Sequence, residues 1–330
     1  MSQTIKWGIL STAGIAQTEF IPAIQQVDNA ELIAISSLSG QARSVADRFG
    51  IKHAYDSYEE LLDNSEIDAV YIPLPNHLHK EWAIKAAEKK KHVLSEKPAA
   101  LTATDITEIK QACEENQVKF MEGFMYAFHP QHQRVRELIQ SGTIGEVKRF
   151  NASFSFLLGD AEGNIRTSKD KGGGSIYDIG CYAIHAMRHI LQEEPQSVRT
   201  EAVIDHAYDV ETSAISHFKF ESGIVAIAES SFDLFFNNAY EVIGTKGRIT
   251  VPRAFRPDTS GGEGIVVIQN DNGIKEERLI GDLFEAEIKH LSDCIINQTD
   301  PMISFDDTYH NMKAIDACFK SIEENKRITI

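Results

Sequence analysis

Short apolar runs alternate with amphipathic stretches through the first 122 residues of the chain. Apolar runs of about four to eight residues are typical of buried strands, and apolar residues at helical spacing predict helices. Strict alternation of the two predicts βαβ units, whose right-handed crossovers build a doubly wound parallel sheet. We expect strands at 5–11, 31–37, 69–72, 92–95 and 119–123, helices at 15–27, 42–49, 76–90 and 102–116, and a short strand and helix within 55–62.

The pattern changes after about residue 125, where strand-like runs follow one another with fewer helices between them. Tight turns such as 221–223 and 245–247 connect several runs, which indicates a mostly antiparallel sheet. This predicts an α/β protein with a Rossmann domain at 1–122 and an α+β domain with a large open sheet at 123–330. The second domain's expected strands are 147–156, 198–205, 211–220, 224–232, 240–251 and 265–269, and its expected helices are 129–140, 175–191, 284–297 and 306–325.

The segment 224–228 is apolar at every position. A sheet with one solvated face normally alternates apolar and polar residues. We therefore expect another subunit to cover one face of this sheet, in a homodimer or homotetramer.

Composition argues against several classes of protein. The net charge is −16, and an acidic surface repels phosphate backbones, so no nucleic-acid partner is expected. No stretch approaches the roughly 20 apolar residues of a membrane helix, so no membrane partner is expected. The four cysteines form no CxxC pair, which predicts no metal site and fits a reducing compartment. Since the N-terminus carries no apolar leader, we expect a cytoplasmic protein.

A turn of small residues joins the first expected strand to the first expected helix. Such a turn lets the backbone approach a pyrophosphate, which the helix N-terminus attracts. Serine and alanine stand at the three glycine positions of GxGxxG, so an ordinary strand–helix turn is the alternative. The candidate pyrophosphate contacts are Ser11, Thr12, Ala13, Gly14 and Ile15.

The second expected strand ends in Ser36-Ser37-Leu38-Ser39, without the acidic residue that binds the ribose 2′-hydroxyl of NAD. Small hydroxyls accept a 2′-phosphate more easily, and Arg43 follows shortly after. This pattern favours NADP over NAD as the cofactor. The alternative is that the serines only end a strand.

Two more turns follow strands at the carboxyl edge of the expected parallel sheet, where ligands bind in such folds. The first holds the candidate cofactor contacts Pro73, Leu74, Asn76 and His77, with helix capping by Asn76 as the alternative.

The second of these turns is Glu96-Lys97-Pro98. Proline disfavours helix for the residue before it, so Lys97 is presented in extended backbone beside the expected cofactor. A lysine there can polarise a carbonyl or alkoxide oxygen. The alternative is a solvated lysine paired with Glu96.

Three glycines, 172–174, precede an expected helix that carries Asp178 and Tyr182 one turn apart on one face. Glycines allow a close backbone approach to a ligand or another segment. The alternative is structural: Ser175-x-x-Asp178 reads as a capping-box-like helix start, although capping explains neither the glycines nor Tyr182.

With Glu96-Lys97-Pro98 and the segment 172–182 together, the chain resembles the Gfo/Idh/MocA family of glucose–fructose oxidoreductase and inositol dehydrogenase. The resemblance extends over 7–16, 122–154 and 240–251. It implies a Rossmann domain, an α/β domain whose open sheet mediates oligomerisation, Lys97 as the catalytic lysine of the EKP motif, and Asp178 as a substrate-binding or catalytic residue.

Tyr182 stands where many members of the family have histidine, which resembles the branch of dihydrodiol and xylose dehydrogenases. That branch commonly uses NADP. Ser37, by contrast, stands where many NADP-binding members have arginine, so NAD stays open as the alternative cofactor.

These observations predict reversible hydride transfer between the nicotinamide and a secondary alcohol or hemiacetal carbon of a sugar, polyol or cyclic diol. Tyr182 is expected to be the general base, Lys97 to stabilise its anion and the developing alkoxide, and Asp178 to orient either the substrate hydroxyl or Lys97. The alternative function is a non-catalytic sensor that binds NAD(P). Weaker candidates for the substrate pocket are Tyr126, His129, Arg166 and Lys169.

Overall fold

The computed structural model describes residues 3–330. They form two compact units, each built around its own sheet. The first unit runs to Met125 and includes Phe284–Tyr309, and the second comprises Tyr126–Leu283 and His310–Ile330.

Residues 284–309 pack in the first unit, whereas the sequence analysis assigned them to the second domain. Their helix α8 (Leu283–Asn297) is tied to the first sheet by polar contacts. The indole Nε1 of Trp7 donates to Ser292 Oγ at 3.3 Å, and Asn29 Nδ2 donates to Asp293 Oδ1 at 2.7 Å. Hydrophobic periodicity predicts the helix but does not tell which sheet it covers.

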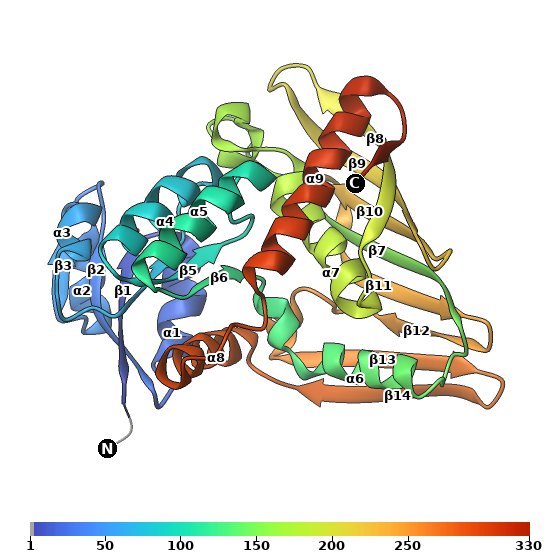
Figure 1. The fold of residues 1–330 in the computed structure, drawn as a ribbon, viewed down its shortest axis with the longest axis horizontal. Coiled ribbons are helices and arrows are strands. Elements are labelled where there is room, and N and C mark those ends of the chain that lie inside the picture. The colour runs from blue at the N-terminus through green and yellow to red at the C-terminus, as the bar shows by residue number, and fades with distance from the viewer. Residues whose placement is uncertain (1–2) are drawn as a thin grey trace. The chain divides into compact units, whose positions relative to one another are not determined.

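The first sheet is parallel, with the strand order β3-β2-β1-β4-β5-β6 (Figure 1). The order reverses beside β1, which is the switch point where ligands bind in doubly wound folds. Its strands are β1 (Ile5–Leu10), β2 (Ala30–Ser36), β3 (His53–Tyr55), β4 (Ala69–Ile72), β5 (His92–Glu96) and β6 (Phe120–Gly123).

Helices connect these strands, as the alternating pattern predicts. Thr102 Oγ1 accepts from the Asp105 amide and so caps α5, and Ser57 caps α3 in the same way. The connecting helices are η1 (Ala16–Phe20), α1 (Ile21–Ile24), α2 (Ala42–Phe49), α3 (Tyr58–Leu62), η2 (Asn76–Leu78), α4 (His79–Glu88) and α5 (Ala103–Asn116).

The second sheet has the strand order β14-β13-β12-β11-β7-β10-β9-β8-β15. Its neighbouring strands are antiparallel except for the parallel pair β7 and β10. The strands are β7 (Val147–Leu157), β8 (Pro195–Asp205), β9 (Val210–Phe220), β10 (Val225–Ser231), β11 (Asp233–Gly244), β12 (Gly247–Val251), β13 (Glu263–Asn270), β14 (Gly273–Ile280) and β15 (Ile328–Thr329). The predicted fold class is confirmed.

Helices cover one face of this sheet. α7 (Cys181–Leu191) packs on β7 and β10, and α6 (Pro130–Gln140) packs on β13 and β14. α9 (Phe305–Glu324) reaches β8 and β9 through Ser321 and Cys318. Short helices precede them at η3 (Met125–Phe128), η4 (Ile165–Thr167), η5 (Lys169–Lys171), η6 (Ile176–Gly180) and η7 (Pro257–Ser260).

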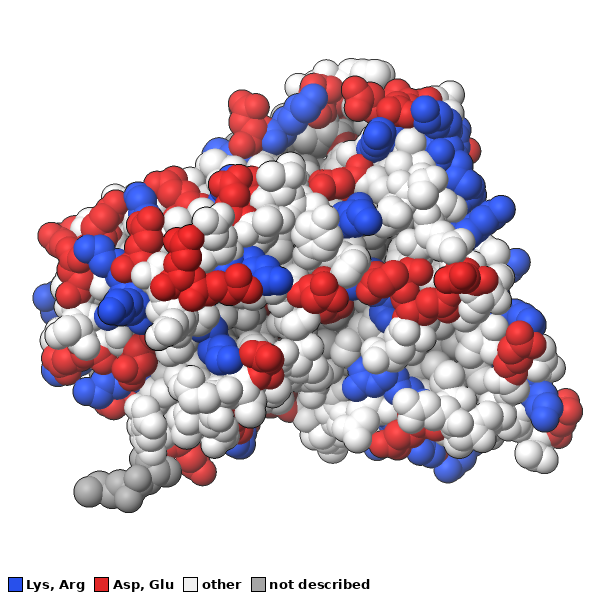
Figure 2. Space-filling model, viewed as in Figure 1, with Lys and Arg blue, Asp and Glu red and all other residues white. Residues whose placement is uncertain are grey.

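The surface charge and the character of the helices relate to the expectations about nucleic-acid and membrane partners. Figure 2 shows acidic and basic side chains interspersed on the face in view, within a net charge of −16. Of the helices formed by residues 3–330, none combines the length and apolar character that crossing a bilayer requires.

Candidate active site

The turn after β1 has the small side chains and the open approach that a diphosphate needs. Ser11 adopts a φ of 144°, a conformation that glycine adopts more readily, and its hydroxyl accepts from the Ala13 amide at 3.0 Å. Gln17 Nε2 donates to the Thr12 carbonyl at 2.8 Å. A Cβ on Gly14 would meet no heavy atom within 4 Å, so the start of the helix is accessible.

Hydroxyl groups gather where β1 and β2 end. Thr12 Oγ1 lies 3.1 Å from Ser37 Oγ, which lies 2.9 Å from Ser39 Oγ. Ser36 does not join them, because its hydroxyl donates to the Ile9 carbonyl. Arg43 is exposed on the first turn of α2. The segment 36–43 holds no carboxylate, so its groups fit a 2′-phosphate better than a bare ribose.

His79 links the turns that follow β4 and β5. Its Nε2 lies 2.7 Å from the Leu74 carbonyl and its Nδ1 lies 2.7 Å from the Pro98 carbonyl, with the ring fully buried. Pro73 and Leu74 are buried in this turn, while His77 is exposed. Asn76 begins η2, directly after Pro75.

The Glu96-Lys97-Pro98 turn is held by its own carboxylate. Glu96 Oε1 accepts from the Tyr71 hydroxyl at 2.7 Å, and Glu96 Oε2 accepts from the Lys97 amide at 3.3 Å. Glu122 Oε1 accepts from the Ala99 amide at 2.9 Å on the other side of the turn. Lys97 itself is half-buried at the carboxyl end of β5. These bonds fix the backbone that carries the lysine.

Asp178 pairs with Arg166 in the second unit. Arg166 Nε donates to Asp178 Oδ2 at 2.6 Å, and the guanidinium lies 5.7 Å from the centre of the Phe156 ring. Ser175 does not cap this helix; its hydroxyl lies 3.0 Å from Ser230 Oγ, and the Asp178 amide donates to the Gly174 carbonyl. The capping-box alternative is therefore wrong.

Tyr182 lies one turn after Asp178, where the π-helical turn η6 passes into α7. π turns are frequent at functional sites. The Tyr182 ring is 5% exposed and lies 5.5 Å from Phe154 and 5.6 Å from Phe255, measured between ring centres. The aromatic packing holds the buried ring in place.

Three of the weaker candidates have other partners. Tyr126 is fully buried, and its hydroxyl lies 2.6 Å from His185 Nδ1. His129 begins α6, where its ring accepts from the Gln131 amide. Lys169 is exposed and pairs with Asp209 at 2.5 Å.

Comparisons with known proteins match these features. Residues 5–124 match the family described as an oxidoreductase family with an NAD-binding Rossmann fold, and residues 132–250 match the GFO/IDH/MocA C-terminal domain. D-xylose 1-dehydrogenase (NADP(+)) 2 of Haloferax volcanii is 35% identical over 324 residues, which are 98% of this chain and 99% of the relative. The chain belongs to the Gfo/Idh/MocA oxidoreductase family. The predicted family is confirmed, and so is the prediction that the protein is an NAD(P)-dependent oxidoreductase.

Solved structures resemble this Gfo/Idh/MocA oxidoreductase over nearly its full length. A 3-ketoreductase from Actinomadura kijaniata in complex with NADP and TDP-benzene has a TM-score of 0.92 at 29% identity, covering 97% of this chain and 98% of its own. An aldose–aldose oxidoreductase from Caulobacter crescentus complexed with glycerol has a TM-score of 0.93 at 26% identity, covering 99% and 100%.

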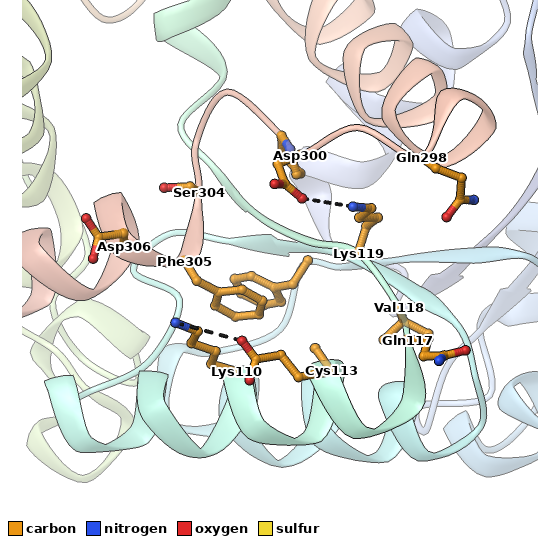
Figure 3. A pocket seen from close by; sticks show the side chains of 13 residues that line it. Lys110, Cys113, Gln117, Val118, Lys119, Gln298, Asp300, Ser304, Phe305 and Asp306 are labelled. Carbon is orange, nitrogen blue, oxygen red and sulfur yellow. Dashed lines mark hydrogen bonds and ion pairs between the residues drawn. The ribbon is translucent and has the colours of Figure 1, made fainter.

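A cavity of about 460 Å³ lies elsewhere in the first unit of the oxidoreductase (Figure 3). Phe120 and Phe305 stack beside it with ring centres 5.0 Å apart, and Lys119 pairs with Asp300 at 2.9 Å. Phe120 is the first residue of β6, so the cavity opens at the amino end of a strand. Ligands of such sheets bind at the carboxyl ends, and we do not assign this cavity to the cofactor.

Two residues near the site escaped the sequence analysis of this oxidoreductase. His79 was passed over in favour of His77, although it occupies the buried side of the helix start. Glu211 lies within an expected strand, and an acidic residue in a strand is the sequence signal that could have indicated it. The described part of the chain contains no group of three or more candidate metal ligands.

Proposed function

We propose that this oxidoreductase catalyses reversible, NADP-linked hydride transfer at a secondary alcohol or hemiacetal carbon of a sugar, polyol or cyclic diol. The observation that carries the proposal is the helix start where Asp178, paired with Arg166, precedes Tyr182 by one turn. Relatives named as a xylose dehydrogenase, a 3-ketoreductase and an aldose–aldose oxidoreductase support a sugar-like substrate.

NADP is the cofactor that the residues of the first unit fit best. The hydroxyls of Thr12, Ser37 and Ser39 donate to a 2′-phosphate, and Arg43 supplies positive charge. The bound nicotinamide supplies the hydride acceptor or donor. We assign the pyrophosphate to Ser11, Thr12, Ala13, Gly14 and Ile15, the 2′-phosphate ribose to Ser37 and Arg43, and the nicotinamide side to Pro73, Leu74, Asn76, His77, Glu96 and Lys97.

Tyr182 removes the hydroxyl proton during oxidation and returns it during reduction. A free tyrosine titrates near pH 10, so it needs a nearby cation to act as a base at neutral pH. Lys97 supplies this charge and stabilises the alkoxide that develops on the substrate. Asp178 accepts from a substrate hydroxyl and orients it, and the ion pair with Arg166 orients that carboxylate.

Tyr126 supports this chemistry from beneath. Its ring lies 5.8 Å from that of Tyr182, and its hydroxyl is engaged by His185. We therefore assign Tyr126 to packing that holds Tyr182, and Arg166 and Asp178 to the substrate.

The two units divide the work. We assign dinucleotide binding to the first unit, and substrate binding and oligomerisation to the second. Val225 and Ile227 are partly exposed on the sheet face away from α7, and Ile215 is 47% exposed beside them, which supports a homodimer or homotetramer through this face. The four cysteines are buried and none forms a disulfide within residues 3–330, which supports a reducing, cytoplasmic location.

Absorbance at 340 nm tests the function. The purified protein is mixed with NADP or NAD and a panel of aldoses, polyols and cyclic trans-diols, and in reverse with NADPH and ketoses or dicarbonyls. We expect turnover with at least one sugar-like substrate, faster with NADP than with NAD. Cofactor binding without turnover anywhere in the panel would favour the sensor instead.

A further inference from the structure

Glu211 is a buried carboxylate that the proposed mechanism does not use. It lies near the start of β9 and is 5% exposed. Burying a carboxylate is costly unless strong hydrogen bonds compensate, so a buried glutamate requires a physical reason.

The reason lies in the turn before η6. Glu211 Oε1 accepts from the Ile176 amide at 2.9 Å, a bond inside the protein between β9 and the first residue of η6. Ile176 stands two residues before Asp178 and six before Tyr182. The bond therefore anchors the amino end of the helix that carries both proposed site residues.

Gly174 shows how closely the turn approaches this carboxylate. A Cβ on Gly174 would lie 2.3 and 2.4 Å from the two carboxylate oxygens of Glu211, and the glycine has a φ of +106°. The positive φ disfavours any side chain at this position, and a Cβ here would displace the Glu211 carboxylate. The backbone at Gly174 therefore lies directly against the Glu211 carboxylate.

The neighbouring glycine ties in the segment that carries Arg166. A Cβ on Gly173 would lie 2.6 Å from the Arg166 carbonyl and 2.8 Å from the Ser168 carbonyl. The Gly174 amide donates to the Arg166 carbonyl at 2.8 Å. The glycine turn thus joins Arg166 on one side to Glu211 on the other.

We propose that Glu211 is a positioning residue, whose carboxylate holds the glycine turn and the start of η6 so that Asp178 and Tyr182 face the substrate correctly. The inference rests on the proposed function for its catalytic consequence. Its structural consequence, the order of the helix start, does not depend on that function.

The basic side chains of the glycine-turn segment pair with carboxylates other than Glu211. Arg166 pairs with Asp178, and Lys169 pairs with Asp209. Burial raises the pKa of the Cys318 thiol on α9 to about 11, and the charge of Glu211 acts in the same direction. The thiol is therefore neutral in the assay. The hydrogen bond to Ile176 is therefore the contact to remove.

Glu211→Gln and Glu211→Leu form a matched pair, since both keep the approximate size of the side chain and only glutamine keeps an acceptor for the Ile176 amide. At pH 8 we expect Glu211→Leu to lower kcat/KM for the sugar by about 30-fold or more, and Glu211→Gln to stay within about threefold of wild type. The Kd of NADPH should be unchanged in both. Glu201→Leu, an exposed glutamate on β8, is the control and should match wild type.

Hydrogen exchange supplies the readout that needs no turnover. Amides of residues 176–182 should exchange at least about tenfold faster in Glu211→Leu than in Glu211→Gln. If Glu211→Leu does not fold, Glu211→Asp decides, because its shorter side chain keeps the charge but draws the carboxylate away from the Ile176 amide.

Equal activity and equal exchange in the leucine and glutamine variants, or a fully active aspartate variant where leucine does not fold, would overturn the inference. A wild-type protein without any turnover, in which exchange still differs between the pair, would instead refute the proposed function alone.

Discussion

Arg166 Nε donates to Asp178 Oδ2 at 2.6 Å, which joins the irregular segment after β7 to the helix start that carries Tyr182. The Asp178 side chain is 17% exposed and that of Arg166 is 39% exposed, so the pair is partly shielded from water but within reach of a ligand. A substrate hydroxyl that bonds to Asp178 therefore meets a carboxylate that is already oriented.

Replacing Arg166 should weaken substrate binding more than chemistry. In Arg166→Met we expect KM for the sugar to rise about tenfold with a smaller change in kcat, because Asp178 loses the donor that orients it. Lys169→Met is the matched control, since Lys169 is an exposed cation of the same segment that pairs with Asp209. Steady-state kinetics at saturating NADP measures both; an unchanged KM in Arg166→Met would remove Asp178 and Arg166 from the substrate site.

Lys97 sets the pH range of the oxidation reaction in this account. Without its charge, the base must ionise closer to the pH of a free tyrosine near 10. We expect Lys97→Met to lower kcat about 100-fold at pH 7 and to move the rise of kcat/KM to higher pH. The measurement is a pH profile from 6 to 10; a profile that keeps its shape, with or without a loss of rate, would contradict the role.

Ser37→Asp should reverse the cofactor preference. The new carboxylate would repel a 2′-phosphate and accept from the 2′-hydroxyl of NAD. We expect the ratio of kcat/KM for NADP to that for NAD to fall about 100-fold. Ser44→Asp on the exposed face of α2 is the control for a nearby negative charge. An unchanged ratio in Ser37→Asp would show that the hydroxyl cluster does not bind the 2′-phosphate.

Glu211 makes stability depend on pH. Burial raises its pKa to about 7 from an ordinary value of 4.5. Between these two pH values the folded protein holds a proton that the unfolded chain has released, so the free energy of unfolding falls as the pH rises through this window. The loss attributable to this group is about 3 kcal/mol and is complete above about pH 7.

Urea unfolding of Glu211→Gln at two pH values checks this dependence. The variant should be more stable than wild type at pH 8 and nearly equal to it at pH 5, because glutamine has no charge to bury. Glu201→Gln should show no such difference, since Glu201 is exposed. A stability difference that is the same at both pH values would refute a buried titration.

The fold could be predicted from the sequence because the hydrophobic periodicity and the order of strands and helices are local properties of the chain. Alternating strands and helices predicted the parallel sheet, and the spacing of Asp178 and Tyr182 placed them one turn apart. Parallel strands end at one edge of the sheet, and there the Thr12 and Ser37 hydroxyl oxygens lie 3.1 Å apart.

Contacts between distant segments were beyond the same reasoning. Ser175 reads locally as a helix cap, yet its hydroxyl meets Ser230, which is 55 residues away. The Glu211 carboxylate lies against Gly174, and this contact becomes visible only once β9 lies against the turn. The polar strand β14 went unpredicted because its exposed residues give no apolar pattern.

Tyr182 carries the central claim, and one substitution tests it. Tyr182→Phe removes only the hydroxyl, and Tyr177→Phe removes the same group from a tyrosine of the same helix start, whose ring packs on Phe319. The measurement is kcat/KM for the best sugar, with NADP saturating at pH 8, followed at 340 nm. The account predicts a loss of about 100-fold or more in Tyr182→Phe, with an unchanged Kd for NADPH and near-normal activity in Tyr177→Phe. Activity of Tyr182→Phe within about threefold of wild type would contradict it.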